Sequence, residues 1–81
     1  MALNTTTSNI SAVPNYTVEL GYEGNKLIYQ GKAKIGSLTS QAVWQIKKLI
    51  YSGDNLTAIQ WANGNDSFNN IWDNRNLITY S

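Results

Sequence analysis

The sequence predicts a small, mainly β protein, in which about five short strands form an antiparallel sheet, sandwich or barrel after an extended N-terminal arm. Its 81 residues allow one domain at most. Apolar and polar side chains alternate over residues 16–22, as they do in a half-buried strand. Two clusters rich in Gly, Asn and Asp, at residues 23–26 and 52–55, each separate two apolar segments, which is typical of β-hairpins. We therefore expect an arm over residues 1–15 and a single β domain over residues 16–81.

The arm, MALNTTTSNISAVPN, is mostly Thr, Ser and Asn with a few small apolar side chains. So little apolar surface does not offset the entropy lost on ordering, about 1–2 kcal/mol per residue. The segment also lacks the basic and apolar regions of an ordinary secretory signal. We expect a partner chain to order this arm, with Pro14 as a candidate contact.

A first hairpin is predicted over residues 16–34. The alternating apolar residues of its first strand are Tyr16, Val18, Leu20 and Tyr22. Gly24 and Asn25 tolerate the positive φ that tight hairpin turns need, and the apolar segment 27–29 follows at once.

Residues 39–51 fit two structures. Ala42, Val43, Ile46, Leu49 and Ile50 fall near one face of a helix, and the same segment also alternates as an extended strand does. The turn cluster at residues 52–55 and the apolar segment 56–61 favour a second hairpin, with residues 44–51 as its first strand. We favour the strand and leave the helix as the alternative.

Residues 62–76 are rich in Asn, Asp and Gly and predict a loop tied to the core by large apolar side chains, with a short helical turn at residues 67–72. Residues 77–80 predict a last short strand. The predicted core consists of Trp44, Ile46, Ile59, Trp61 and Phe68. We expect Trp44 and Trp61 to be cross-strand partners on paired strands.

The composition argues against catalysis and against metal binding. The chain contains no Cys and no His, so it lacks the commonest general base, the strongest neutral-pH nucleophile and the usual zinc ligands. Asp66 and Asp73 stand seven residues apart, and we interpret them as solvated loop carboxylates and not as a catalytic pair. The loop at residues 63–66 lacks the bidentate Glu of a calcium loop. We expect no enzyme activity, no metal and no cofactor.

Charge is sparse and nearly balanced. The chain has six Lys and Arg residues and five Asp and Glu residues. Charged residues make up 14% of the chain, where about 25% is typical. No apolar segment is long enough to span a membrane. Lys32, Lys34, Lys47 and Lys48 are the only concentration of positive charge, which leaves single-strand nucleic-acid binding as a minor alternative. A surface with so few charges is consistent with residence inside an assembly.

The second half of the chain resembles a group of short tailed-bacteriophage proteins that are described as virion-associated or uncharacterised. The resemblance covers residues 32–81. It rests on GSLTS, AVWQIKKLIY, a Gly-Asp-Asn turn, AIQWANGNDSFNNIWDNRN and the closing LITYS. The resemblance implies a component of the phage capsid, neck or tail, made in the host cytoplasm, and it implies no catalytic residue.

We therefore expect a structural virion protein that contacts other virion proteins in a symmetric, multi-copy or homo-oligomeric assembly. The alternative is a surface module that binds host glycans or a receptor through exposed aromatic side chains and loop asparagines. The candidate contacts for either role are Pro14, Tyr22, Trp72, Arg75 and Tyr80. Arg75 is predicted to fix the loop through Asp73, or else to reach an acidic group of a partner.

Overall fold

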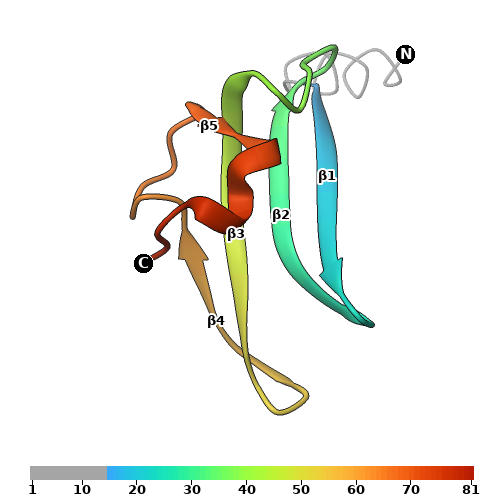
Figure 1. Cartoon of the computed structure of the whole chain (residues 1–81), viewed down its shortest axis with the longest axis vertical. Coiled ribbons are helices and arrows are strands. Elements are labelled where there is room, and N and C mark those ends of the chain that lie inside the picture. Colours follow the sequence, from blue (N-terminus) through green and yellow to red (C-terminus); the bar gives the residue numbers. More distant parts are fainter. Residues whose placement is uncertain (1–14) are drawn as a thin grey trace, which may run out of the picture.

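A computed structural model describes residues 15–81 and confirms the mainly β fold. The arm predicted at residues 1–15 lies outside the described part except for Asn15, and Pro14 is also outside it. Five strands and one short 3-10 helix follow one another along the chain (Figure 1): β1 (Tyr16–Glu23), β2 (Lys26–Lys34), β3 (Ala42–Ser52), β4 (Asn55–Trp61), β5 (Asn70–Ile71) and η1 (Trp72–Leu77). All pairings are antiparallel.

Two hairpins, β1–β2 and β3–β4, form most of the sheet. Gly24 and Gly53 occupy the two tight turns, and each has a φ of 60°, a conformation in which a Cβ is disfavoured. The ambiguous segment is strand β3, because its hydrogen bonds go to β2 on one edge and to β4 on the other. The sheet order is β1-β2-β3-β4.

One edge of β3 is shared by two short partners. The second half of β3 pairs with β4, and its beginning, at Ala42 and Trp44, pairs with β5. Ala62, which follows β4, donates its amide to the carbonyl of Ile46 at 3.0 Å. The chain then leaves the edge as a loop over residues 63–69 and returns to the same edge as β5. Figure 1 shows β4 and β5 on the same side of β3.

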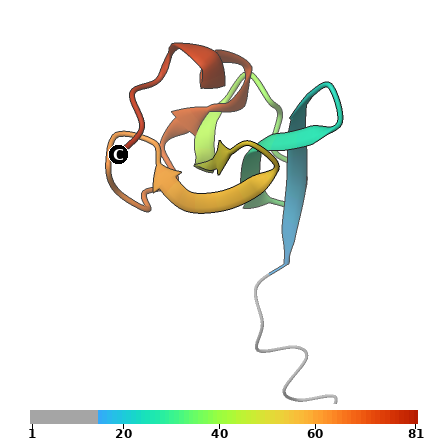
Figure 2. The same ribbon diagram turned by 90° about the horizontal axis from the view of Figure 1, so that it is seen from below.

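The core lies between the sheet and the C-terminal segment. Figure 2 shows η1 and the residues after it on one side of the curved sheet, which we name the covered face. Its buried apolar side chains are Ala33, Trp44, Ile46, Ala62 and Trp72. The ring centres of Trp44 and Trp72 lie 6.0 Å apart, and the Trp44 indole N–H donates to the carbonyl of Leu38 at 3.0 Å. Two tryptophans thus supply most of the apolar volume that so small a core has.

Three expectations about the core need correction. Ile59 is 50% exposed and Phe68 is 41% exposed, so neither belongs to it, and Trp61 is only half-buried. Trp44 and Trp61 are not cross-strand partners: Trp44 lies opposite Asn70, and Trp61 lies opposite Lys47. Because residues 44 and 47 are an odd number apart on one strand, their side chains point to opposite faces of the sheet.

The C-terminal elements also differ from expectation. The predicted helical turn at residues 67–72 is instead η1, which begins at Trp72, because Asn70 and Ile71 pair with β3. The side chain of Asn70 is buried and donates to the carbonyl of Trp44 at 3.0 Å. The predicted strand at residues 77–80 is reduced to a single bridge between Ala62 and Tyr80. No helix within residues 15–81 is long and apolar enough to cross a membrane.

Candidate interaction surface

The second face of the sheet, which we name the outer face, is set by the strand register. Residues that pair directly across antiparallel strands point to the same face. Tyr16 pairs with Lys34, and Val18 pairs with Lys32, which in turn pairs with Gln45. The outer face consists of Tyr16, Val18 and Leu20 from β1, Gln30, Lys32 and Lys34 from β2, Val43, Gln45, Lys47 and Leu49 from β3, and Ile59 and Trp61 from β4.

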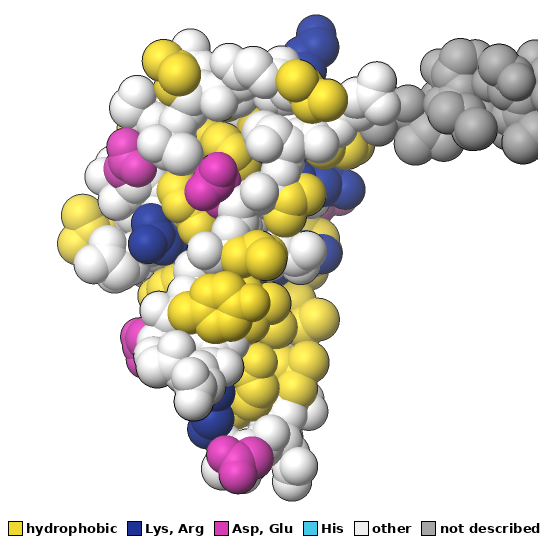
Figure 3. Space-filling model, turned by 90° about the vertical axis from the view of Figure 1, so that its right-hand side faces the viewer, with side chains coloured by type: hydrophobic (Ala, Val, Ile, Leu, Met, Phe, Trp, Pro, Cys, Tyr) yellow, Lys and Arg dark blue, Asp and Glu magenta, His cyan; other side chains and the backbone are white. Residues whose placement is uncertain are grey.

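Strand β1 turns its apolar side chains outward. Val18 and Leu20 are each 48% exposed, whereas Glu19 between them is half-buried and Gly21 is buried. The alternation in the sequence does mark a strand, but the apolar members lie on the exposed side. Burying a Val or Leu side chain contributes about 1.5–3 kcal/mol, so this strand leaves a large apolar contribution unused. Figure 3 shows hydrophobic side chains gathered over the lower half of the β1 side of the molecule.

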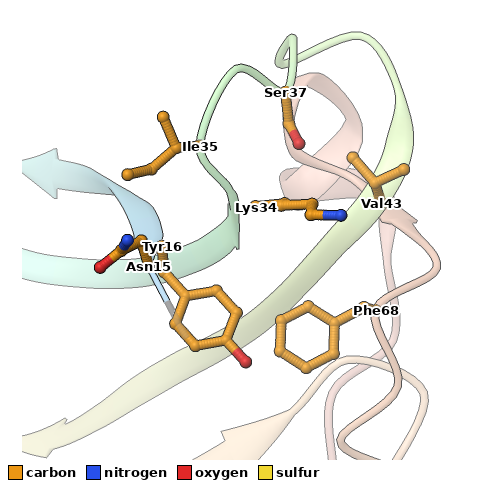
Figure 4. Close-up of a pocket in the computed structure, with 7 residues that line it drawn as sticks. All are labelled: Asn15, Tyr16, Lys34, Ile35, Ser37, Val43 and Phe68. Carbon is orange, nitrogen blue, oxygen red and sulfur yellow. The ribbon is translucent and has the colours of Figure 1, made fainter. Parts of the chain in front are cut away.

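An open apolar pocket of about 770 Å³ forms one end of the outer face. Figure 4 shows the residues that line it: Asn15, Tyr16, Lys34, Ile35, Ser37, Val43 and Phe68. The Tyr16 and Phe68 rings stack at 5.7 Å with an angle of 15° between them. Gln45 holds the loop in place by donating its amide to the carbonyl of Asp66 at 2.9 Å. Phe68 therefore anchors the loop to the outer face, which explains why it is absent from the core.

Three lysines lie among these apolar side chains. The ammonium of Lys32 sits 4.7 Å from the centre of the Tyr16 ring, and that of Lys47 sits 5.2 Å from the centre of the Trp61 ring. Lys34 lines the pocket. Such contacts let the lysine stems cover apolar surface while the charged ends stay near solvent. The outer face therefore combines apolar side chains with positive charge.

Arg75 belongs to a separate, polar pocket beside β1. Its guanidinium lies 4.6 Å from the centre of a Trp72 ring and donates to the Trp72 carbonyl at 3.2 Å. The expected ion pair with Asp73 is absent; among residues 15–81 the structure has one ion pair, between Lys26 and Asp54 at 3.5 Å. Stacking on the aromatic rings, and not an ion pair with the Asp73 carboxylate, fixes the position of the Arg75 guanidinium. This pocket, of about 300 Å³, is lined by Gly21, Tyr22, Glu23, Tyr29, Asp73, Arg75 and Asn76.

Tyr80 closes the covered face beside this pocket. Its hydroxyl donates to the carbonyl of Arg75 at 2.8 Å, and its ring lies 5.7 Å from that of Tyr29. Burial, and secondarily the neighbouring Tyr29, raises the pKa of Tyr80 above its ordinary value. Tyr80 is thus a half-buried structural side chain that closes the C-terminal segment onto the sheet.

The predicted contact residues fall into different places. Trp72 is 4% exposed, so its assignment to an interface is wrong: its indole fills the space over Gly31. Tyr22 is 59% exposed and stays a candidate, while Arg75 and Tyr80 are half-buried. Sequence reasoning missed Val18 and Leu20 as surface residues and did not place the three lysines beside them. The sequence shows how the lysines are spaced, but it does not show which residues of the neighbouring strands they lie opposite.

The described residues offer little coordination chemistry. Within residues 15–81 there is no group of three or more acidic side chains that would hold a metal ion. Comparisons with protein-family models, curated proteins and solved structures found no match. The outer face, with its exposed apolar side chains, its pocket and its lysines, is the candidate site.

Proposed function

We propose that this protein is a non-enzymatic structural component of a bacteriophage particle, in the capsid, neck or tail, and that it acts through protein contacts in a symmetric assembly. The observation that carries the proposal is the outward apolar row of β1. A strand with its apolar side chains outside and its polar side chains inside is inconsistent with an isolated sheet. It becomes consistent when a neighbouring chain covers the row.

The edge of the sheet formed by β1 supports the same role. Strand β1 is an edge of the sheet, and its sequence, YTVELGYE, contains neither the Lys nor the Pro that commonly protect exposed edges. Among the strands of residues 15–81, β1 pairs with β2 alone, so its other edge can accept a further strand. The formal net charge of +1 causes little overall repulsion between copies, provided that their lysine-bearing outer faces do not meet. These features suit a subunit that is covered once it is assembled.

The placement in a phage particle rests on the resemblance of residues 32–81 to short virion-associated proteins. Repetition in a symmetric assembly would let individually weak contacts add up. A small sheet with a thin core gains the most from such neighbours, because a short chain buries a smaller share of its surface than a large one does.

The glycan-binding alternative has lost part of its support. It relied on exposed aromatic side chains such as Trp72 and Tyr80, and the Trp72 ring is buried beneath Arg75 while Tyr80 is half-buried. The polar pocket beside the exposed ring of Tyr22 is the observation that still favours it, because carboxylates, amides and an open ring suit polyols.

Incorporation into purified particles tests the proposed function. Particles from infected cells should contain the wild-type chain at a fixed stoichiometry, measured by quantitative mass spectrometry. We expect Val18→Glu to lower its incorporation strongly, because it places a charge in the apolar row. The matched control is Asn74→Glu, which places the same charge on an exposed residue of η1 and should be incorporated normally.

Circular dichroism should give the wild-type spectrum for both variants, so that lost incorporation reflects a lost contact. Absence of the wild-type chain from particles would refute the proposed function. A glycan array that gives a hit which Tyr22→Ala removes would favour the alternative.

A further inference from the structure

We infer that the outer face binds a different protein chain whose surface carries an apolar row beside carboxylates. The inference rests on the proposed function as an assembling subunit and adds the chemistry of the neighbour. The chemistry of this neighbour follows from the arrangement of apolar and positive side chains on the outer face, from the position of the acidic residues, and from the contacts of the aromatic rings.

The outer face carries an apolar strip and a positively charged strip side by side. In one row Val18 of β1 lies beside Lys32 of β2. In the next row Leu20 lies beside Gln30, which pairs with Lys47 of β3. An apolar strip along β1 is thus followed by a strip of lysines over β2 and β3. A complementary surface needs apolar side chains over the first strip and negatively charged carboxylates over the second.

The carboxylates of the chain are placed mostly away from this face. Glu19 pairs with Gly31, whose missing Cβ would point at Trp72, so Glu19 belongs to the covered face. Glu23 and Asp73 line the polar pocket with Arg75. Asp54 pairs with Lys26 at the hairpin turns, and Asp66 alone lies in the loop next to the outer face. The outer face therefore has an excess of positive charge.

This excess disfavours a second copy packed face to face. Such packing would set Lys32, Lys34 and Lys47 either against the same three lysines or against the apolar strip of β1, and neither arrangement gives these ammonium groups a carboxylate to pair with. A partner that carries Asp or Glu at these positions would form charge-assisted contacts instead. Charge complementarity thus selects a different chain over another copy of this one.

Nucleic acid also brings negative charge, but the aromatic rings do not suit it. Single-stranded nucleic acids bind such sheets by stacking bases on open ring faces. Here the Tyr16 ring already stacks on Phe68 and carries the ammonium of Lys32, and Lys47 lies over the ring of Trp61. The exposed surface that remains is largely aliphatic, as at Val18, Leu20 and Ile59. Aliphatic side chains fit an apolar protein surface better than they fit bases.

Site-specific photocrosslinking in infected cells tests the inference. The full-length chain is made with p-benzoylphenylalanine in place of Leu20, and in a control with the same residue in place of Asn74. After irradiation, the crosslinked peptides are sequenced by mass spectrometry. We expect the Leu20 position to join one defined segment of another phage protein, with Asp or Glu close to the attachment point. The Asn74 position should not join that segment.

A charge variant separates a specific contact from simple apolar adhesion. In the chain with the photoreactive residue at position 20, Lys32→Glu should lower the crosslink yield about fivefold or more, because it sets like charges against each other. The matched control is Lys26→Glu, which makes the same change at a hairpin end far from the lysine strip. It removes only the exposed ion pair with Asp54, which contributes little to stability, so its yield should match that of the parent. Thermal melts of both variants monitor the fold.

Four results would overturn the inference: a crosslink to this chain itself, a crosslink to nucleic acid that nuclease removes, a yield that Lys32→Glu leaves unchanged, or no crosslink. The proposed function is scored separately, by the presence of the chain in purified particles. A crosslink to an acidic segment in cells, with no chain in particles, would reject the proposed function and leave the inference in place.

Discussion

The indole of Trp72 lies directly over Gly31, so closely that a Cβ at residue 31 would be 2.6 Å from the ring. This contact joins η1 to the middle of the sheet and fixes where the C-terminal segment lies. It also explains why a glycine stands in the interior of β2, where it weakens a strand in other contexts.

Gly31→Ala should therefore destabilise the protein by about 1–3 kcal/mol, because the bulky indole has no space to move into. The matched control is Gly21→Ala, where the closest atom is the end of the flexible Arg75 side chain at 3.0 Å, and the loss should be smaller. Urea unfolding followed by tryptophan fluorescence measures both. Equal losses in the two variants would contradict the role assigned to Trp72.

The same truncation at two isoleucines separates the core from the outer face. Ile46 is 1% exposed, so Ile46→Ala should cost about 2–5 kcal/mol. Ile59 is 50% exposed, so Ile59→Ala should cost less than about 1 kcal/mol in the isolated chain. Urea titrations of the two variants provide the comparison. A large loss at Ile59 would mean that the outer face is already buried in solution.

Arg75 should stabilise the C-terminal segment without help from Asp73. We expect Arg75→Ala to cost about 1–2 kcal/mol, through the lost stacking on Trp72 and the lost hydrogen bond to its carbonyl. Asp73→Asn should change stability by less than about 0.5 kcal/mol, because no ion pair joins the two residues. Thermal unfolding tests both, and a clear loss in Asp73→Asn would restore the expected ion pair.

Stability should fall in alkaline solution because of Tyr80. Its pKa is raised in the folded chain, whereas an unfolded tyrosine ionises near pH 10. The contribution of the protonated hydroxyl is thus complete below about pH 10 and is lost as the pH rises further. Denaturant unfolding between pH 8 and 11 should show this decline for the wild type and a weaker one for Tyr80→Phe. Tyr22→Phe, an exposed control, should keep the wild-type decline.

The sequence predicted the local elements well, because they depend on local chemistry. The turn glycines at 24 and 53 and the alternation along β1 and β3 led to both hairpins at nearly their observed bounds. The β-rich class followed from the same signals.

The assignment of faces could not be predicted, because it depends on contacts between distant segments. Nothing near Val18 in the sequence says that Trp72, far along the chain, covers the opposite side of the sheet. The same contact turned Trp72 from a suspected surface residue into part of the core, and the Gln45 contact to the loop carried Phe68 to the outer face. The candidate surface is therefore defined by the pairing of residues across the strands, which the order of apolar and polar residues in the sequence does not reveal.

The loop over residues 63–69 lies outside the strand pairing, so its length can change without shifting the register of the strands on either side of it. The chain leaves the edge of β3 after Ala62 and rejoins it at Asn70, so the strands on both sides are held by their own hydrogen bonds. Extra residues inserted after Asn65 would enlarge the excursion and break the hydrogen bond from the Ser67 amide to the Asn65 side chain, while each flanking strand would keep its partners. One extra residue inside β3 would instead reverse every side chain beyond it. The sheet would therefore tolerate foreign sequence in this loop, but the insert would stand next to the surface that we expect a neighbour to cover, and would obstruct it.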